Sequence, residues 1–262
     1  ETLEPSIETK AEFAEGSTRV VNGAVVTDTV TYEGLVDGKN YHLDAKLMSK
    51  DGKTVLGTGS ADFEADSSKG FTTVDIKVDN AEKPVDSAVA FEELTSTEVE
   101  SNGDETPDAE KPNKIAEHKD LEDQAQTVDS KETLEPSIET KAEFAEGSTR
   151  VVNGAVVTDT VTYEGLVDGK NYHLDAKLMS KDGKTVLGTG SADFEADSSK
   201  GFTTVDIKVD NAEKPVDSAV AFEELTSTEV ESNGDETPDA EKPNKIAEHK
   251  DLEDQAQTVD SK

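Results

Sequence analysis

The sequence lacks cysteine and long apolar runs, and it has few basic residues. Without cysteine no disulfide can form, whichever side of a membrane the protein occupies. No apolar run approaches the length that a membrane-spanning helix needs, and no signal peptide opens the sequence. With 26 lysine and arginine residues against 60 aspartate and glutamate residues, the formal net charge is -34. Such acidity argues against binding of nucleic acid or of anionic membrane surfaces, and it favours solubility.

Apolar and aromatic residues are also scarce, at 32% and 5% of the chain. The core must therefore be lean, and a covalent cross-link matters more in such a domain than in an apolar one. What the chain does contain is a perfect internal repeat, because residues 1–131 are identical to residues 132–262. This length is typical of one domain, so we expect two copies of a single domain, over residues 1–131 and 132–262. Each copy carries half of the net charge of -34, which is -17.

Short segments of alternating apolar and polar residues follow one another along each copy. In residues 7–13, Ile7, Thr9, Ala11 and Phe13 fall on one face and charged residues on the other, as in a half-buried strand. No convincing amphipathic helix interrupts the series. The pattern predicts an all-β fold of two tandem immunoglobulin-like antiparallel β-sandwich domains. In the first copy we expect an acidic loop at residues 95–114, and strands at residues 7–13, 24–32, 41–48, 54–56, 61–64, 71–78, 87–94 and 125–128.

Three polar residues fall on otherwise apolar strand faces. Thr9 lies on the inner face of the first strand, Asp28 shares a face with valines, and Glu92 shares a face with Ala90 and Leu94. A carboxylate on a buried face is costly unless it is paired. Each residue also has a purely structural interpretation. Thr9 would be a strand threonine bonded to a backbone carbonyl, Asp28 would lie at a strand end or bulge, and Glu92 would lie on an exposed edge strand.

Residues 118–126 bring together an imidazole, spaced carboxylates and a carboxamide, namely His118, Asp120, Asp123 and Gln126. A glutamine is chemically inert unless a nucleophile attacks its side-chain carbonyl, and such an attack needs a nearby histidine and acids. We interpret the stretch as one half of a self-made covalent cross-link. In an immunoglobulin-like sandwich the first and last strands can lie side by side, so Thr9 can meet Gln126.

Other functions fit parts of the sequence. A ligand-binding β-sandwich without a cross-link would use the loop at residues 95–114, although this loop has no aromatic residue as an anchor. Calcium would use Asp62, Asp66 and Asp75, although no EF-hand spacing is present. A hydrolase or transferase would use the histidine and acids on an external substrate, without any cofactor motif beside them. A lysine–asparagine isopeptide would require Asn or Asp in place of Gln126. We expect no cofactor and no metal ion.

Five motifs follow one another in each copy. In the first copy they are Ile7-x-Thr9-x-Ala11, Asp28-Thr29-Val30-Thr31-Tyr32-x-Gly34-Leu35, Gly38-Lys39-x-Tyr41-x-Leu43, Val89-Ala90-Phe91-Glu92-x-Leu94 and His118-x-Asp120-x-x-Asp123-x-x-Gln126-Thr127. In this order they resemble the ester-bond domains of Gram-positive surface adhesins, also called VaFE repeats. The resemblance covers essentially the whole repeat. It implies a spontaneous intramolecular ester between Thr9 on the first strand and Gln126 on the last.

The resemblance also implies roles for further residues. Asp28 and Glu92 match the paired acids of the family, with Glu93 as the alternative at a slip of one residue. His118 matches the family's histidine, and Asp123 and Asp120 match its further acids. In the second copy the same positions are Thr140, Asp159, Glu223, His249, Asp251, Asp254 and Gln257.

The chemistry expected of these groups is a single acyl transfer. Two buried carboxyl groups would share a proton, take the threonine proton and help to protonate the leaving nitrogen. His118 would position the carboxamide or stabilise the developing oxyanion. Ammonia would leave once and an ester would remain, so the protein would modify itself and would not be an enzyme in the ordinary sense.

The resemblance further implies a structural stalk module of an adhesin, with mechanical, thermal and proteolytic resilience. Its parent protein would be anchored to the cell wall and displayed outside the bacterial cell. The expected partners are neighbouring repeats in the same chain, while a host ligand would be bound elsewhere in the parent protein. No contact with nucleic acid and no membrane insertion of this segment is expected.

Overall fold

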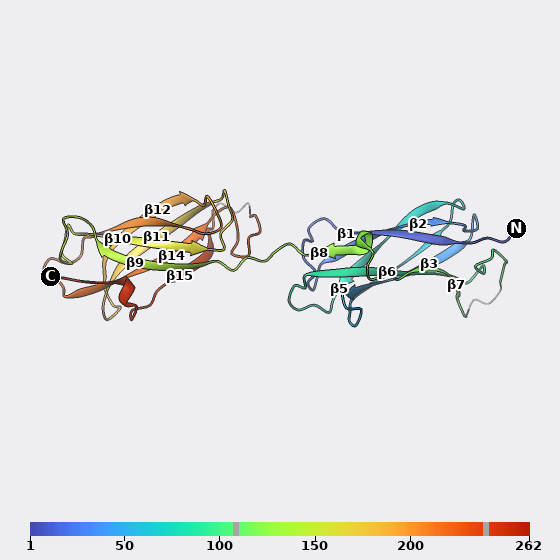
Figure 1. The fold of residues 1–262 in the computed structure, drawn as a ribbon, viewed down its shortest axis with the longest axis horizontal. Helices are drawn as coiled ribbons and strands as arrows, with labels where there is room; N and C mark the ends of the chain where they lie inside the picture. Colours follow the sequence, from blue (N-terminus) through green and yellow to red (C-terminus); the bar gives the residue numbers. More distant parts are fainter. Residues whose placement is uncertain (107–109, 238–240) are drawn as a thin grey trace. The chain divides into compact units, whose positions relative to one another are not determined.

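The computed structural model describes residues 1–106, 110–237 and 241–262. The chain divides into two compact units, Glu1–Glu132 and Thr133–Lys262, and the described part of each contains eight strands and one short 3-10 turn (Figure 1). The elements of the first unit are β1 Ser6–Phe13, β2 Val25–Glu33, β3 Asn40–Ser49, β4 Val55–Glu64, β5 Gly70–Val78, β6 Ser87–Ser96, β7 Asn113–His118, η1 Gln124–Gln126 and β8 Thr127–Asp129. Those of the second are β9 Ser137–Phe144, β10 Val156–Glu164, β11 Asn171–Ser180, β12 Val186–Glu195, β13 Gly201–Val209, β14 Ser218–Ser227, β15 Asn244–His249, η2 Gln255–Gln257 and β16 Thr258–Asp260.

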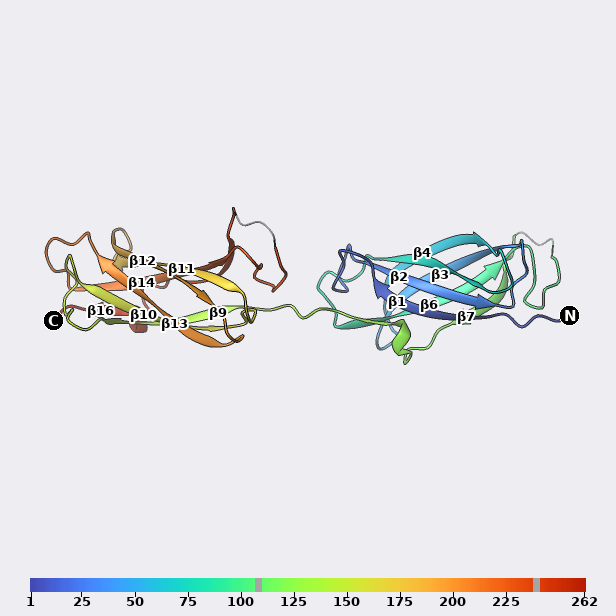
Figure 2. The ribbon, with the colours of Figure 1, turned by 90° about the horizontal axis from the view of Figure 1, so that it is seen from above.

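The strands of each unit form an antiparallel sandwich, which confirms the predicted fold class. In the first unit the order is β1-β2-β5-β4-β3-β6-β7, with β8 also paired to β6. Figure 2 shows the strands of this unit turned by 90° from the view of Figure 1. Strands β4 and β5 share only two residue pairs, so the sheet separates there into two layers. One layer is β1-β2-β5, and the other contains β4, β3 and β6 with β7 and β8. Strand β1 packs against β7, β8 and η1, which brings the beginning and the end of the unit together.

The core lies between the two layers and follows the period of two in the sequence. On β1, the side chains of Ile7, Thr9 and Ala11 are buried while their neighbours are exposed. Such alternation is what one buried face of an antiparallel sheet requires. At one end of the core, Phe63 stacks between Tyr32 and Tyr41, with ring centroids 5.4 and 5.8 Å away.

Two of the expected strands are in fact one. Residues 54–56 and 61–64 were predicted as separate segments, but β4 runs through Gly57 and Gly59 without a break. A Cβ atom on Gly59 would lie 2.0 Å from the carbonyl oxygen of Asp75, and one on Gly57 would lie 2.4 Å from that of Lys77. These glycines therefore allow β5 to approach closely and do not mark a turn.

The C-terminal part of each copy also differs from the prediction. The last strand, expected at residues 125–128, is the shorter β8, and the residues before it form the turn η1. The expected loop at residues 95–114 includes the end of β6 and the start of β7. Within it, Val99 is fully buried and forms a bridge to Glu105, so the first half of the loop packs on the domain. Residues 107–109 of the loop, and 238–240 in the second copy, lie outside the described residues.

The segment that follows β8 is anchored to the first unit. The buried Arg19 side chain donates from Nε to the carbonyl of Lys131 (3.0 Å) and from Nη2 to that of Glu132 (2.9 Å). The Ser130 hydroxyl accepts from the amide of Val20 (2.7 Å) and donates to the carbonyl of Val85. These bonds hold residues 130–132 against the domain after the last strand has ended.

Candidate cross-linking site

Strand β6 has one edge that two short strands share. β8 pairs with residues 87–89 of this edge, and β7 pairs with residues 92–96. The turn η1 packs against β6 here, and among the described residues Ala90 has no strand partner on this side. The side chain of Gln126 takes the place of the missing strand, because its Nε2 donates to the carbonyl of Ala90 at 3.0 Å. An interruption in the β6 edge thus leads the carboxamide into the core.

The carboxamide of Gln126 is fully buried and has a defined orientation. Its Nε2 also donates to Oδ2 of Asp28 at 3.0 Å. The Ala90 carbonyl can only accept a hydrogen bond, so the nitrogen and not the oxygen of Gln126 must face it. The oxygen Oε1 has no hydrogen-bond partner among the described residues. The carboxamide therefore presents its nitrogen to an acid and leaves its carbonyl oxygen unbonded.

Asp28 on β2 and Glu92 on β6 form a buried acid pair. Both residues are 0% exposed, although they come from opposite layers of the sandwich. Burial, followed by the hydrogen bond with Asp28 and the charges of Asp28 and Asp44, raises the pKa of Glu92 to about 11. With both groups ionised, no donor in the described part of the chain reaches either oxygen of Glu92. A proton on Glu92 supplies the missing donor and removes one buried charge, so the pair holds a proton at neutral pH.

Thr9 completes the set from β1. Its neighbour Ala11 is paired with Asp28, and Thr9 itself is paired with Val30, so its side chain points to the same face as the aspartate. Thr9 is 7% exposed, and its Oγ1 has no hydrogen-bond partner among the described residues. The alternative of a strand threonine bonded to a backbone carbonyl therefore does not describe this hydroxyl. β1 packs against η1, the turn that ends at Gln126.

His118 and Asp123 form a second, half-buried pair beside the acids. His118 lies directly opposite Glu92 in the β6–β7 ladder, and its Nε2 is 2.6 Å from Oδ2 of Asp123. This hydrogen bond lowers the pKa of Asp123 below its ordinary value. No bond joins His118 to Oε1 of Gln126, so a direct role of the histidine at the carboxamide stays a prediction. Asp120 is exposed and accepts from the amide of Glu122 in a turn.

Asp123 also caps the turn that carries Gln126. Its Oδ1 accepts from the amide of Ala125 at 3.0 Å, which makes Asp123 the N-cap of η1. The motif predicts Asp123 only as an acid, and this cap was not predicted from the sequence. The signal was present, because an aspartate just before a short turn is a common cap. The carbonyl of Ala90 was also missed, since a backbone group leaves no mark in the sequence.

The second copy repeats the arrangement. The Nε2 atom of Gln257 is 3.0 Å from Asp159 and 3.0 Å from the carbonyl of Ala221. The pKa of Glu223 is raised to about 11 by burial and by Asp159. The pair of His249 and Asp254 has the same separation of 2.6 Å. The hydroxyl of Thr140 is buried and has no hydrogen-bond partner in the part of the chain that the structure describes.

Unsatisfied polar atoms are confined to this site. Within the described ranges, the buried side-chain oxygens without a partner all belong to four residues of each copy: Thr9, Asp28, Glu92 and Gln126, and Thr140, Asp159, Glu223 and Gln257. Buried polar groups are almost always hydrogen-bonded, so such a cluster requires a functional explanation. A hydroxyl, a carboxamide and a proton-sharing acid pair, enclosed by apolar side chains, are the reactants and the acid–base groups of an acyl transfer.

Glu93, the alternative acid, does not enter the site. It is half-buried on the other face of β6, and its carboxylate lies 3.8 Å from the ammonium group of Lys119. Two of the three aspartates considered for calcium have other partners. Asp62 contacts His42, and Asp75 accepts from the hydroxyl of Thr27.

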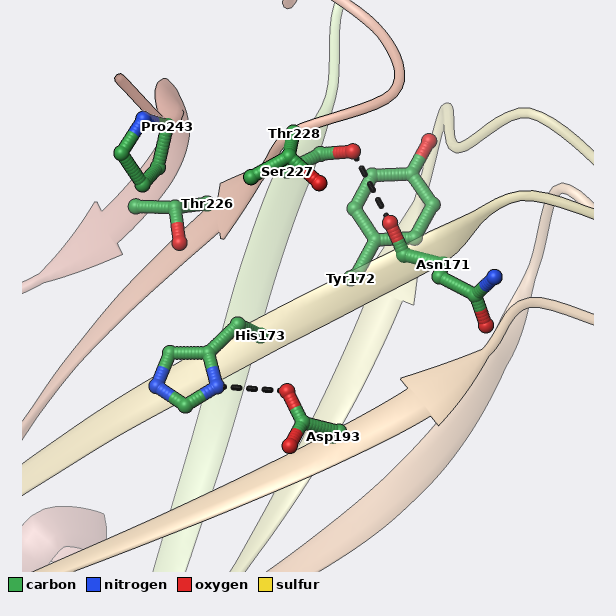
Figure 3. Close-up of a pocket in the computed structure, with 8 residues that line it drawn as sticks. All are labelled: Asn171, Tyr172, His173, Asp193, Thr226, Ser227, Thr228 and Pro243. Atoms are coloured by element: carbon green, nitrogen blue, oxygen red, sulfur yellow. Dashed lines mark hydrogen bonds and ion pairs between the residues drawn. The ribbon is translucent and has the colours of Figure 1, made fainter. Parts of the chain in front are cut away.

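One open hollow lies away from the cross-linking residues. In the second copy it has a volume of about 450 Å³ and is lined by His173, Asp193, Ser227 and Pro243, among others (Figure 3). His173 points toward Asp193 across two strands, with Nδ1 2.6 Å from Oδ1. None of the site residues described above lines this hollow.

In the described residues no helix has the length and apolar character to cross a membrane.

The fold and the site define a β-sandwich domain that encloses a threonine hydroxyl and a glutamine carboxamide together with an acid pair. The chain belongs to the family of the T-Q ester bond containing domain, whose model matches residues 5–130 and again 136–261. This family is one of structural modules and not of enzymes.

Comparison with solved structures adds distant similarities. The chain is similar to a bacterial adhesin from Mobiluncus mulieris containing intramolecular disulfide, isopeptide and ester bond cross-links, at 15% identity and a TM-score of 0.42, over 85% of this chain and 80% of that chain. It is also similar to a glycosyl hydrolase family 2 member from Bacteroides cellulosilyticus, at 10% identity and a TM-score of 0.30, over 92% of this chain and 28% of that chain. No curated protein matches the sequence. The assignment therefore rests on the family model.

Proposed function

We propose that each domain forms an intramolecular ester, between Thr9 and Gln126 in the first copy and between Thr140 and Gln257 in the second. The observation that carries this proposal is the confinement of the partnerless buried oxygens to these residues and their acid pairs. A site that served only the fold would satisfy these atoms or replace them by apolar groups. The family assignment supports the same chemistry.

The reaction is an acyl transfer that needs no external reagent. Oγ1 of Thr9 attacks Cδ of Gln126, the Oγ1–Cδ bond forms and the Cδ–Nε2 bond breaks. The acid pair takes the hydroxyl proton and returns a proton to Nε2, so that ammonia leaves and the pair is unchanged. Asp28 is suited to the second step because it already accepts from Nε2 at 3.0 Å. Folding supplies proximity, which is worth many powers of ten for aligned groups.

The product is preserved by the same burial that promotes its formation. Thr9 is 7% exposed and Gln126 is 0% exposed, so water has little access to the ester. The reaction therefore stops after a single turnover in each domain. Since the ester joins β1 to the turn before β8, it closes nearly the whole domain into one covalent loop.

We place this cross-linked module in the stalk of a bacterial surface adhesin. A covalent bond between the first and last elements would carry tension past the fold and would resist heat and proteolysis. The strong negative charge of the chain suits repulsion between successive domains. In this proposal the parent protein is a cell-wall-anchored protein of a Gram-positive bacterium, neighbouring repeats are the partners of each domain, and a host ligand is bound elsewhere in the parent.

The mass of the denatured chain tests the ester directly. Each ester expels one ammonia, so two closed domains should lower the mass by about 34 Da and one closed domain by about 17 Da. Thr9→Val keeps the shape of the side chain without the nucleophile, and we expect it to halve the deficit while Thr140 still reacts. Thr73→Val, on the exposed face of β5, is the matched control and should leave the full deficit.

Peptide mapping should then find Thr9 joined to Gln126 and Thr140 joined to Gln257. A folded wild-type protein without any mass deficit would refute the ester. The module would then be a ligand-binding β-sandwich without a cross-link, which was the alternative function inferred from the sequence.

A further inference from the structure

The turn η1 is only three residues long, yet it must hold Gln126 in a fixed position. Its first end is fixed by Asp123, which caps the turn with its side chain and accepts from the amide of Gln126 with its carbonyl at 3.1 Å. A turn of this length has little stability of its own. The other end must therefore be fixed as well if the carboxamide is to keep its orientation.

Thr127 supplies this second attachment. Its hydroxyl donates to the carbonyl of Asp123 at 2.9 Å, and its amide bonds to the carbonyl of Gln124. Its backbone belongs to β8 and is paired with Val89 of β6. Thr127 therefore joins the turn to the sheet at the residue directly after Gln126.

The second copy shows the same contact. The hydroxyl of Thr258 donates to the carbonyl of Asp254 at 2.8 Å, and its backbone is paired with Val220. Thr127 is half-buried, and within the described residues its hydroxyl bonds to the carbonyl of Asp123 and not to Thr9, Gln126 or the acid pair. Any effect of this hydroxyl on the reaction must therefore pass through the geometry of the turn.

We infer that Thr127 and Thr258 are positioning residues for ester formation, an inference that rests on the function proposed above. The hydroxyl closes the turn around Gln126, so that Nε2 faces Asp28 and Ala90 while Cδ is held for attack by Thr9. A displacement of reacting groups by about 1 Å can slow a reaction about a hundredfold. We therefore expect loss of the hydroxyl to slow closure of its own domain by about ten- to a hundredfold.

Two substitutions separate positioning from a role in strand stability. Thr127→Val removes the hydroxyl but keeps a β-branched side chain, whereas Thr127→Ser keeps the hydroxyl and loses the branch. Valine suits a strand better than serine, so a purely structural role predicts closure as fast with valine as with serine, or faster. The positioning role predicts the opposite order, with serine close to wild type and valine slow.

The measurement is a time course on newly made full-length protein. Cell-free synthesis is stopped by denaturant at intervals, and the digested protein is analysed by mass spectrometry for the cross-linked peptides. The substitution gives the first copy a peptide of distinct mass, so Thr258 in the second copy serves as an internal clock within the same molecule. The mirror variants Thr258→Val and Thr258→Ser control for the position of the domain in the chain.

Slow closure of the valine copy, with normal closure of the serine copy, would support the inference. Closure of the valine copy at the rate of its unchanged neighbour would overturn it, and so would a serine copy as slow as the valine copy. If the unchanged copy also fails to lose ammonia in folded protein, the ester itself is refuted. That result is distinguishable, because it does not depend on the substitution.

Discussion

Replacement of Thr9 by valine sets two opposite effects on stability against each other. The hydroxyl of Thr9 is buried without a hydrogen-bond partner, so an apolar group of the same shape should stabilise the un-cross-linked fold by about 1 kcal/mol. The same change prevents the ester. A cross-link from residue 9 to residue 126 constrains the unfolded chain by about 5 kcal/mol, by analogy with a disulfide that closes a loop of this size.

The cross-link should win, with a net loss of about 4 kcal/mol in the substituted domain. Unfolding of one copy carries an entropy of about 0.28 kcal/mol/K, from the average value per residue near 60 °C. The loss then corresponds to a midpoint lower by about 15 °C. Because the two copies are identical in sequence, the second copy provides the reference within the same sample.

Differential scanning calorimetry measures this difference. The wild-type protein should show overlapping transitions for its two domains, whereas Thr9→Val should separate them, with the earlier transition belonging to the first copy. The double variant, which also carries Thr140→Val, should bring both transitions to the lower temperature. If the substituted domain melted at or above the wild-type temperature, the hydroxyl effect alone would be present, and the reasoning from a covalent loop would be wrong.

Four further predictions concern single groups. Glu92→Gln should leave the domain folded but slow ester formation by about 10²–10⁴, measured as ammonia loss over time, because the acid pair loses its transferable proton. In the Thr9→Val background, the raised pKa of Glu92 should make the contribution of this group to stability greatest below about pH 4.5 and make it fall as the pH rises toward about 11. Denaturation curves at several pH values measure this decrease in the free energy of unfolding, and Glu92→Gln should remove it. His42 contacts Asp62, and this bond raises the pKa of the His42 imidazole. The bond's contribution to stability is complete below about pH 6.5 and is lost as the pH rises through the folded pKa of His42. NMR titration of His42 gives that pKa, and comparison with His42→Gln gives the contribution to stability. Gly59→Ala should destabilise the first copy by about 1–3 kcal/mol, because the new Cβ meets the backbone of β5, and an unchanged midpoint would contradict that contact.

The alternation of side chains along the strands was sufficient to place three of the site residues. A period of two puts Thr9, Asp28 and Glu92 on inner faces, and the structure buries each of them. The same period places Glu93 on the opposite face, since a slip by one residue reverses every side chain of a strand. Strand identity and facing are local properties, and local sequence therefore predicts them well.

The end of each copy was harder to predict because its structure depends on long-range partners. β7 begins in a polar, proline-containing segment, and it is a strand because the free edge of β6 is available to pair with it. Residues 124–126 form a turn because Asp123 caps them and Thr127 closes them. The orientation of Gln126 depends on the carbonyl of Ala90, which any residue at that position would supply. Sequence patterns contain no signal for such a backbone group.

The anchored segment after β8 has a mechanical consequence. Residues 127–132 lie outside the covalent loop that an ester at Gln126 would close, and only non-covalent bonds, including those from Arg19 and Ser130, hold their last part to the domain. Tension applied at Glu132 would break these bonds first and would release residues 130–132, about 10 Å of chain at the extended length per residue, before it reached β8. Because the released bonds can form again when the tension falls, each domain would lengthen by a limited, recoverable amount and would dissipate energy without unfolding its core.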